Sequence, residues 1–283
     1  MSAIAEAPPY GISEPLTPLI RRVLAHNPGA FTFTGTGTFI VGHGEVAVID
    51  PGPALDEHYA ALASALEGER VTAILITHTH NDHWPLAARL AEATGAPVIG
   101  MIPRGADPAV YGFDRAPVDG EAICGPGWTL RAMTTPGHAS NHVCYALEEE
   151  NALFSGDHVM GWSTTVIVPP DGDMSDYLAS LDKVAAGGFE VFWPTHGPPI
   201  AKPARFVRSA KAHRLQREER VAGQLAQGPR TVPELVATLY VGLDPRLVGA
   251  AERTVLAHLL RLEKHGRAAW DGAEPLAAVW RQA

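Results

Sequence analysis

One stretch, from Val71 to Pro85, limits the possible folds more than the rest of the chain does. Six mostly apolar residues lead into Thr77-His78-Thr79-His80-Asn81-Asp82-His83-Trp84, and a run with helical spacing starts at Pro85. An apolar run followed by a polar turn and an amphipathic run predicts a strand, a tight loop and a helix. The loop at the end of this buried strand therefore carries three imidazoles and one carboxylate.

The crowding of these side chains predicts a metal site. A single histidine is more often an ordinary polar residue than a ligand. Three imidazoles this close together would repel one another when protonated, however, and a bound cation would hold them neutral. His78 and His80 are two positions apart on an extended chain and point to the same side, while Asp82 and His83 follow after the chain turns. Two sets of ligands can therefore diverge from one loop.

The run from Thr77 to His83 resembles the signature of the metallo-β-lactamase-fold hydrolases. Three later segments resemble the remaining motifs of that family, in the same order: Thr135-Pro136-Gly137-His138, Phe154-Ser155-Gly156-Asp157 and Trp193-Pro194-Thr195-His196-Gly197. The resemblance implies two metal ions, one held by His78, His80 and His138, the other held by Asp82, His83 and His196, with Asp157 as the bridge between them.

The resemblance also bears on the metal and on the residues around it. Imidazole-rich sites accept zinc, iron or manganese, but His80 stands where oxygen-reducing di-iron relatives carry glutamate, which favours two Zn²⁺ per chain. Asp50 is expected behind the metals as a hydrogen-bond acceptor, and a turn-forming aspartate is an equally good interpretation. Asn141 and His142 are candidates for contact with substrate, or else they cap the turn after His138.

The remaining pattern predicts an α/β (α+β) protein in which two mixed sheets pack face to face between helices, an αββα sandwich. Helices are expected over residues 55–66, 85–93 and 176–186, and each motif follows a strand. Five prolines before residue 30 predict an irregular arm there, up to the point where Ile12 to Leu24 find contacts with the body of the protein.

The chain after the last motif predicts a smaller domain. Basic residues recur at every third position along a helix expected over 206–225, and we expect them to form one positive stripe: Arg205, Arg208, Lys211, Arg214, Arg217 and Arg220. A capping box at Thr231, two helices and a hairpin predict a winged-helix-like domain. The expected boundaries are 1–204 for the hydrolase domain, 205–225 for a basic linker helix and 226–283 for the winged-helix-like domain. With it, the chain resembles the β-lactamase-like endoribonuclease family over nearly its whole length.

Charge and composition bear on where the protein is located and on its possible partners. The net charge of −9 combines an acidic body with the basic helix. The first residues lack the basic and apolar regions of a signal peptide, and no apolar run approaches the roughly 20 residues of a membrane span. We therefore expect a cytoplasmic protein without a membrane partner. The nearly balanced charge of residues 250–265 favours packing or homodimer formation over DNA binding by a non-enzymatic winged helix.

The resemblance implies hydrolysis by a metal-bound hydroxide, with Asp82 also accepting a proton from the attacking water. The acidic body favours a small-molecule substrate with an ester, thioester, lactone or β-lactam bond. The whole-chain resemblance and the basic helix leave a metal-dependent endoribonuclease acting on single-stranded RNA as the alternative. That helix lacks the stacking aromatics that single-stranded RNA sites ordinarily have.

Overall fold

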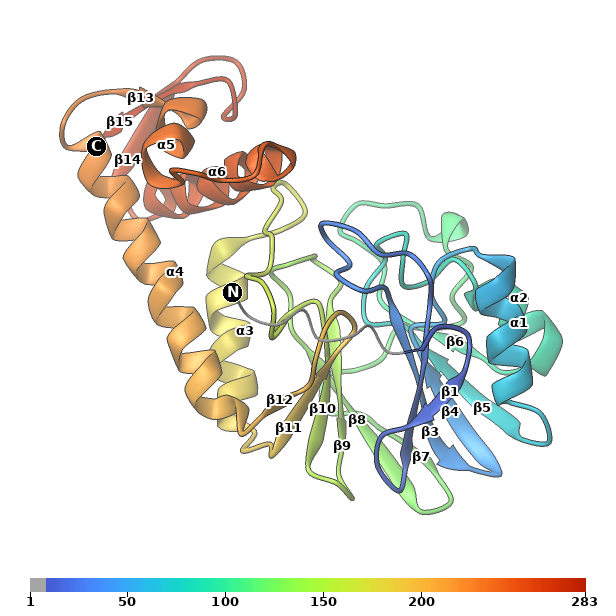
Figure 1. Ribbon diagram of the computed structural model, residues 1–283. Helices are drawn as coiled ribbons and strands as arrows, with labels where there is room; N and C mark the ends of the chain where they lie inside the picture. The colour runs from blue at the N-terminus through green and yellow to red at the C-terminus, as the bar shows by residue number, and fades with distance from the viewer. Residues whose placement is uncertain (1–8) are drawn as a thin grey trace. The chain divides into compact units, whose positions relative to one another are not determined.

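The computed structural model describes residues 9–283 and divides them into two compact units (Figure 1). The first unit comprises the described residues up to Thr134, residues 141–163 and residues 189–202. The second unit comprises residues 135–140, 164–188 and 203–283. The three domain boundaries expected from the sequence stay predictions.

Two six-stranded sheets make up the first unit. The first sheet contains, in spatial order, β1 (Ser13–Pro15), β2 (Ile20–Leu24), β3 (Gly37–His43), β4 (Glu45–Ile49), β5 (Arg70–Leu75) and β6 (Val98–Ile99). The second contains β12 (Ile200–Ala201), β11 (Val191–Pro194), β10 (Ala152–Gly156), β9 (Val143–Leu147), β8 (Trp128–Thr134) and β7 (Ala122–Gly125). Both sheets are mixed, because β5 runs parallel to β4 and β6, and β10 runs parallel to β11. The expected α/β class is confirmed.

The contacts expected for Ile12 to Leu24 take a regular form, and the part of the expected arm before residue 9 lies outside the described residues. Residues Ile20–Leu24 form β2, which pairs antiparallel with β3 along its whole length and is mostly buried. The prolines do not prevent this pairing, because Pro15 is the last residue of the edge strand β1 and Pro18 lies between the two strands, where the ladder needs no N–H group.

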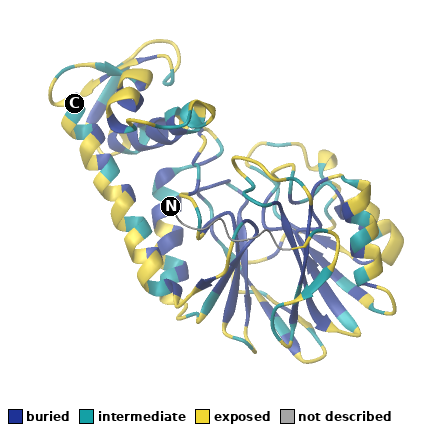
Figure 2. Cartoon of the chain, viewed as in Figure 1, coloured by how far each residue is buried: buried dark blue, intermediate teal, exposed yellow. Residues whose placement is uncertain are grey.

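Apolar side chains fill the space between the two sheets. The shared layer takes its members from both sheets, among them Phe39, Ile49 and Leu75 from the first and Trp128, Tyr145 and Phe154 from the second. The other face of the first sheet is covered by α1 (Asp56–Ala65) and α2 (Ala87–Thr94), which contribute Leu62 and Leu90 to a second apolar cluster. Figure 2 shows the strands largely buried and the outward sides of both helices exposed.

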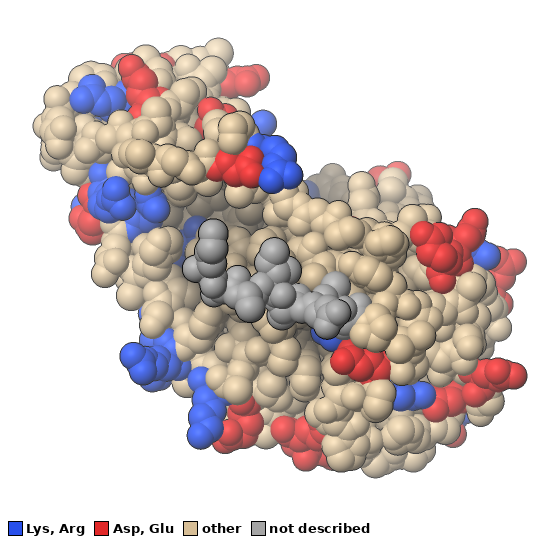
Figure 3. Space-filling view, in the orientation of Figure 1, with Lys and Arg blue, Asp and Glu red and all other residues tan. Residues whose placement is uncertain are grey.

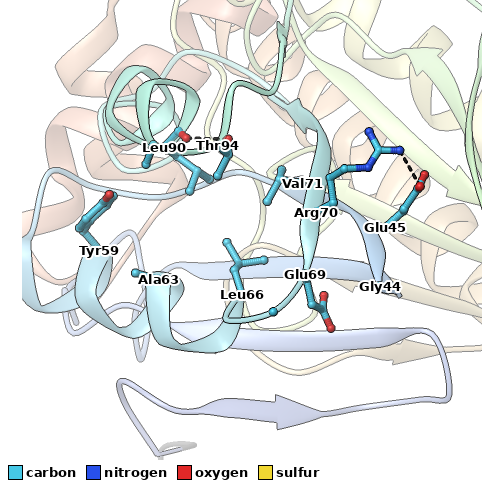
Figure 4. A pocket seen from close by; sticks show the side chains of 12 residues that line it. Gly44, Glu45, Tyr59, Ala63, Leu66, Glu69, Arg70, Val71, Leu90 and Thr94 are labelled. Atoms are coloured by element: carbon cyan, nitrogen blue, oxygen red, sulfur yellow. Dashed lines mark hydrogen bonds and ion pairs between the residues drawn. The ribbon is translucent and has the colours of Figure 1, made fainter.

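A pocket of about 700 Å³ lies where α1, α2 and the amino end of β5 meet (Figure 4). Leu66, Val71 and Leu90 line it, and an ion pair of 2.6 Å between Arg70 and Glu45 borders it. The histidine-rich loop follows the opposite, carboxyl end of β5. The pocket is therefore separate from the candidate metal site.

The second unit is mainly helical. It contains α3 (Met174–Ala186), α4 (Pro203–Leu225), α5 (Val232–Leu239), α6 (Val248–Lys264) and a small sheet of β13 (Arg230–Thr231), β15 (Val279–Gln282) and β14 (Ala268–Asp271), in that spatial order. Thr231 and Glu234 form the expected capping box of α5. The expected hairpin is formed by β14 and β15, extends to Gln282 and contains the fully buried Trp280. None of the helices in residues 9–283 is both long and apolar enough to cross a membrane.

The interpretation of α4 as one positive stripe is wrong. Three residues advance an α-helix by about 300°, so every step of three falls roughly 60° short of a full turn, and the five steps from Arg205 to Arg220 turn the direction by about 300°, most of the way around the helix. Arg214 is accordingly buried and donates to the carbonyl oxygen of Thr165, while Lys211 pairs with Asp182. On the face shown in Figure 3, Lys and Arg side chains occur at separate points along α4 and form no continuous band.

We expect Gly42→Ala to destabilise the first unit strongly. An added Cβ at Gly42 would lie 2.4 Å from the indole ring of Trp128, which is buried and donates to the carbonyl oxygen of Glu45 at 2.9 Å. Moving that ring and adding a side chain at positive φ should lower the free energy of unfolding by about 2–5 kcal/mol.

Gly44→Ala is the matched control, because Gly44 also has a positive φ but no atom within 4 Å of the added Cβ. It should lose only about 1–2 kcal/mol from backbone strain. Urea unfolding measures both variants, and equal losses would contradict the role given to Trp128.

Candidate metal centre

The loop between β5 and α2 carries four of the predicted ligands. Ile74, Leu75 and Ile76 are fully buried and anchor the start of the loop in the first sheet. The chain then passes through His78–His83, and α2 begins at Ala87, two residues after the predicted start. The expected order of strand, loop and helix is confirmed.

His78, His80 and Asp157 form the first group of possible ligands within the first unit. Their ligand atoms lie within 4.8 Å of one another. His78 and Asp157 are buried, and His80 is exposed. Nε2 of His78 lies 2.9 Å from Nδ1 of His80. Two ring nitrogens at this distance need either a proton between them or a cation beside them, because both cannot act as acceptors toward each other.

Asp82, His83 and His196 form the second group, again with ligand atoms within 4.8 Å of one another. Nε2 of His196 lies 3.0 Å from Oδ2 of Asp82 and 3.5 Å from Oδ1 of Asp157. Nε2 of His83 lies 3.7 Å from Oδ2 of Asp157. The Asp157 carboxylate therefore reaches ring nitrogens of the second group while belonging to the first.

The donor atoms suit a divalent metal ion. Nε2 of His83 is buried, and within residues 9–283 it has no hydrogen-bond partner. A buried nitrogen without a partner is costly, and a cation between His83, Asp82 and His196 would supply one. Imidazole and carboxylate ligands are those that zinc, iron and manganese take in proteins.

The charges of the two groups are strongly coupled. Burial raises the pKa of Asp82, but the charge of His83 and a hydrogen bond with His196 outweigh burial and hold that pKa below its usual value. Burial lowers the pKa of His83, but Asp82, Asp50 and Asp157 together raise it well above 6.5. Protons on the imidazoles thus balance the carboxylates in the metal-free protein, and a bound cation would displace them.

Asp50 fixes the orientation of His83. Its Oδ2 accepts hydrogen bonds from Nδ1 of His83 at 2.8 Å and from Oγ1 of Thr77 at 2.7 Å. Its Oδ1 accepts from the backbone N–H of Thr77 at 2.8 Å. With Nδ1 donating to the carboxylate, Nε2 of His83 is left as the ligand atom. Asp50 is fully buried and has a φ of +49°, a conformation that aspartate adopts more readily than most residues.

The loop between β2 and β3 supports the second group, and the sequence did not reveal this. The carbonyl oxygen of Gly35 accepts from Nδ1 of His196 at 3.0 Å, and Oγ1 of Thr36 donates to Oδ2 of Asp82 at 3.3 Å. The side chain of Asn27 in turn binds both the N–H and the hydroxyl of Thr36, each at 2.9 Å. In the sequence, Asn27 and Thr36 are two polar residues in a glycine-rich stretch. Such stretches are common in turns, so the pattern does not indicate a contact with the metal-binding groups.

Asn141 and His142 are fully buried. Nδ2 of Asn141 donates to Oγ1 of Thr79 and to the carbonyl oxygen of Met101, each at 2.9 Å, and Nε2 of His142 accepts from the N–H of Asp157 at 3.2 Å. These contacts hold the ligand-bearing loops. The expected contact with substrate stays a prediction.

His138 is carried by the second unit. It is 7% exposed, and its Nδ1 lies 2.7 Å from the carbonyl oxygen of Val166, a contact that leaves Nε2 as the acceptor nitrogen. The glycine before it has a φ of +138°, and a Cβ there would lie 2.3 Å from Cα of Tyr177. Only glycine therefore suits position 137, which sets the direction of the next residue.

We expect Asp50→Asn to lower the free energy of unfolding by about 2–4 kcal/mol, because it removes a buried charge and turns an N–H₂ group toward two donors. Asparagine tolerates the positive φ, so backbone strain does not change. Asp56→Asn is the control: Asp56 is 91% exposed and pairs with Arg89, so its loss should cost less than about 1 kcal/mol. Urea unfolding of the metal-free protein gives both values, and similar values for the two variants would contradict the role of Asp50.

Comparisons with known proteins agree with this geometry. Residues 32–196 match the metallo-beta-lactamase superfamily, and residues 231–280 match the beta-lactamase associated winged helix domain. An atrochrysone carboxyl ACP thioesterase from Aspergillus terreus is 32% identical over 92% of this chain and 82% of its own length. The beta-lactamase-like protein 2 homolog from Caenorhabditis elegans is 35% identical over 74% of this chain and 71% of its own.

A solved structure agrees as well. A metallo-beta-lactamase family protein from Thermus thermophilus has a TM-score of 0.76 and 26% identity over 94% of this chain and 99% of its own. The fold class and hydrolase class expected from the sequence are thereby confirmed. This chain belongs to the metallo-beta-lactamase superfamily of hydrolases and carries that family's associated winged-helix domain at its C-terminal end.

Proposed function

We propose that this hydrolase binds two zinc ions at the candidate metal centre and hydrolyses a thioester bond of a small acyl substrate. The observation that carries the proposal is the position of Asp157, whose carboxylate belongs to the group of His78 and His80 and also lies within 3.5–3.7 Å of ring nitrogens of His196 and His83. A carboxylate between two sets of imidazoles suits a bridging ligand.

The proposed assignment gives each ion its own ligands. His78 and His80 would hold one ion, Asp82, His83 and His196 would hold the other, and Asp157 would be a ligand shared by both. His138, which is carried by the second unit, is the remaining ligand that the sequence predicts. Zinc is favoured because most of these ligands are imidazoles, although iron and manganese accept the same groups. A zinc ion held by these residues would lower the pKa of a coordinated water to about 7 and so would supply a nucleophile near neutral pH.

The residues of the chain orient this chemistry. Asp50, Gly35 and Thr36 fix the rings of His83 and His196 and the carboxylate of Asp82. The side chain of Asp82 is 26% exposed, and its carboxylate is the group that we propose would accept the proton released by the attacking water. No serine or cysteine nucleophile is required.

The choice of a thioester rests on the relatives. One that matches over most of its length is named an ACP thioesterase. Esters, lactones and β-lactams present a similar carbonyl carbon to the same nucleophile and remain within the proposal as less favoured substrates.

RNA cleavage, the alternative considered from the sequence, depended on a continuous basic stripe along α4. Arg214 and Lys211 of that helix are instead engaged within the second unit. We therefore rank RNA cleavage second.

The metal content tests the proposed centre. Protein purified with zinc should hold about two ions per chain, and His196→Ala should hold about one, because the first group keeps its ligands. His213→Ala is the control, since this histidine is exposed on α4 and should leave the content unchanged. Elemental analysis after gel filtration gives the ratio, and one ion or fewer in the unaltered protein would contradict a two-metal centre.

Turnover tests the bond class. With zinc supplied, the protein should hydrolyse acyl thioesters faster than matched esters, lactones, β-lactams or single-stranded RNA. Asp157→Ala should lower kcat/KM at least about 10³-fold, because it removes a ligand shared by both ions. Arg208→Ala, an exposed change on α4, should leave the thioester rate as it is. Cleavage of RNA alone would replace the proposed activity, and a fully active Asp157→Ala would remove Asp157 from the centre.

A further inference from the structure

Two aromatic rings stack beside the loops that carry the proposed ligands. The ring centroids of Phe33 and Trp162 lie 5.0 Å apart, and their planes differ by 26°. Both side chains are half-buried, and Phe31, two residues earlier at the tip of the same turn, is 53% exposed. A stacked, half-buried aromatic pair with an exposed phenylalanine two residues away offers apolar surface of the kind that lines ligand-binding sites.

The position of Trp162 ties this pair to the candidate metal centre. A Cβ at Gly197, the residue after His196, would lie 2.6 Å from Cδ1 of the indole. Trp162 also follows Asp157 by five positions, and Phe33 precedes Gly35, whose carbonyl oxygen holds the ring of His196. Three loops that carry or orient proposed ligands therefore meet at the two rings.

Phe33 is held in a strained backbone conformation. Its φ is +55°, in the left-handed region that bulky residues rarely adopt. Glycine or asparagine would make the same turn with less strain. Backbone hydrogen bonds of 2.9 and 3.2 Å between Phe33 and Gly29 keep the turn closed. Strain of this kind concentrates at functional sites.

Packing alone gives an incomplete explanation of these aromatics. The stacking of one aromatic pair is comparable in size to the strain of one left-handed residue, so the stack and the strain roughly cancel. Phe31 remains exposed to solvent in either case. A role in binding accounts for both observations.

We propose that Phe31, Phe33 and Trp162 form a recognition surface for a planar aromatic acyl group of the substrate. This inference rests on the proposed hydrolysis of an acyl thioester. An aromatic acyl group would stack against the exposed ring of Phe31 and the accessible parts of Phe33 and Trp162, while its carbonyl group lies toward the loops of Asp157 and His196. The three side chains thereby select the acyl group and take no part in bond cleavage.

The test compares two substrates, the benzoyl and the acetyl thioesters of N-acetylcysteamine, on the zinc-loaded protein. The measured quantity is the ratio of kcat/KM for benzoyl to that for acetyl. We expect this ratio to fall about tenfold in Phe31→Ala and in Phe33→Gly, because each removes a ring that the acetyl group is too small to reach. Phe206→Ala is the control, since it removes an exposed phenylalanine from α4 and should leave the ratio unchanged.

Phe33→Gly separates recognition from folding. Glycine relieves the strain at φ +55°, so the midpoint of thermal unfolding should stay within about 3 °C of the unaltered protein. A ratio within twofold of the unaltered protein in both variants would overturn the proposal. An equal fold-decrease in kcat/KM for the benzoyl and the acetyl thioester would also overturn it.

A binding measurement keeps the inference independent of the proposed activity. Titration of 2-naphthoate into the zinc-loaded protein by calorimetry should show at least about fivefold weaker binding for Phe31→Ala and Phe33→Gly. If neither thioester is hydrolysed, the proposed activity fails while this comparison still decides the recognition surface. Equal affinity in all three proteins, or no measurable binding to any of them, would refute it.

Discussion

The compensation of buried charge is the constraint on which the rest of the structure depends. Three carboxylates, Asp50, Asp82 and Asp157, lie among imidazoles in a largely buried region, where an unpaired charge costs several kcal/mol. Asp50 is satisfied entirely by donors of the protein. Asp82 and Asp157 face Nε2 of His196 and Nε2 of His83. The ring of His196 is held through its Nδ1 by the carbonyl oxygen of Gly35, and Nε2 of His83 has no hydrogen-bond partner within residues 9–283. The negative charge of these carboxylates is balanced by protons on the imidazoles, and a bound cation could balance it in the same arrangement of side chains.

The two sheets make this compensation possible by supplying rigid points of attachment. The loops of His78, Asp157 and His196 follow the carboxyl ends of β5, β10 and β11, and each of these strands has a parallel neighbour. Parallel strands are buried on both faces and have little freedom to shift. Positive φ values at Asp50 and Phe33 are therefore tolerated beside the site, because the buried strands next to them determine the course of the chain.

The sequence predicted those parts of the structure that local patterns determine. The strand and loop from Val71 to His83 could be inferred because the ligands and the apolar run are adjacent. Thr36 and the carbonyl oxygen of Gly35 could not, since they reach Asp82 and His196 only after folding, across 46 and 161 positions. The regular pairing of β2 was not predicted, because the prolines were treated as breakers without regard to their place in the sheet. The error at α4 came from treating a spacing of three as one face of a helix.

Family membership determines the nucleophile more narrowly than the substrate. Activated water attacks thioesters, lactams and phosphodiesters alike, so the groups that bind metal cannot by themselves distinguish these substrates. Discrimination must come from side chains beside the metal-binding groups that do not bind metal, and the residues around Phe33 and Trp162 meet that condition. Such loops lack the regular period of strands and helices. The proposed recognition residues thus lie where sequence patterns are weakest, and their proximity is seen only in the folded loops.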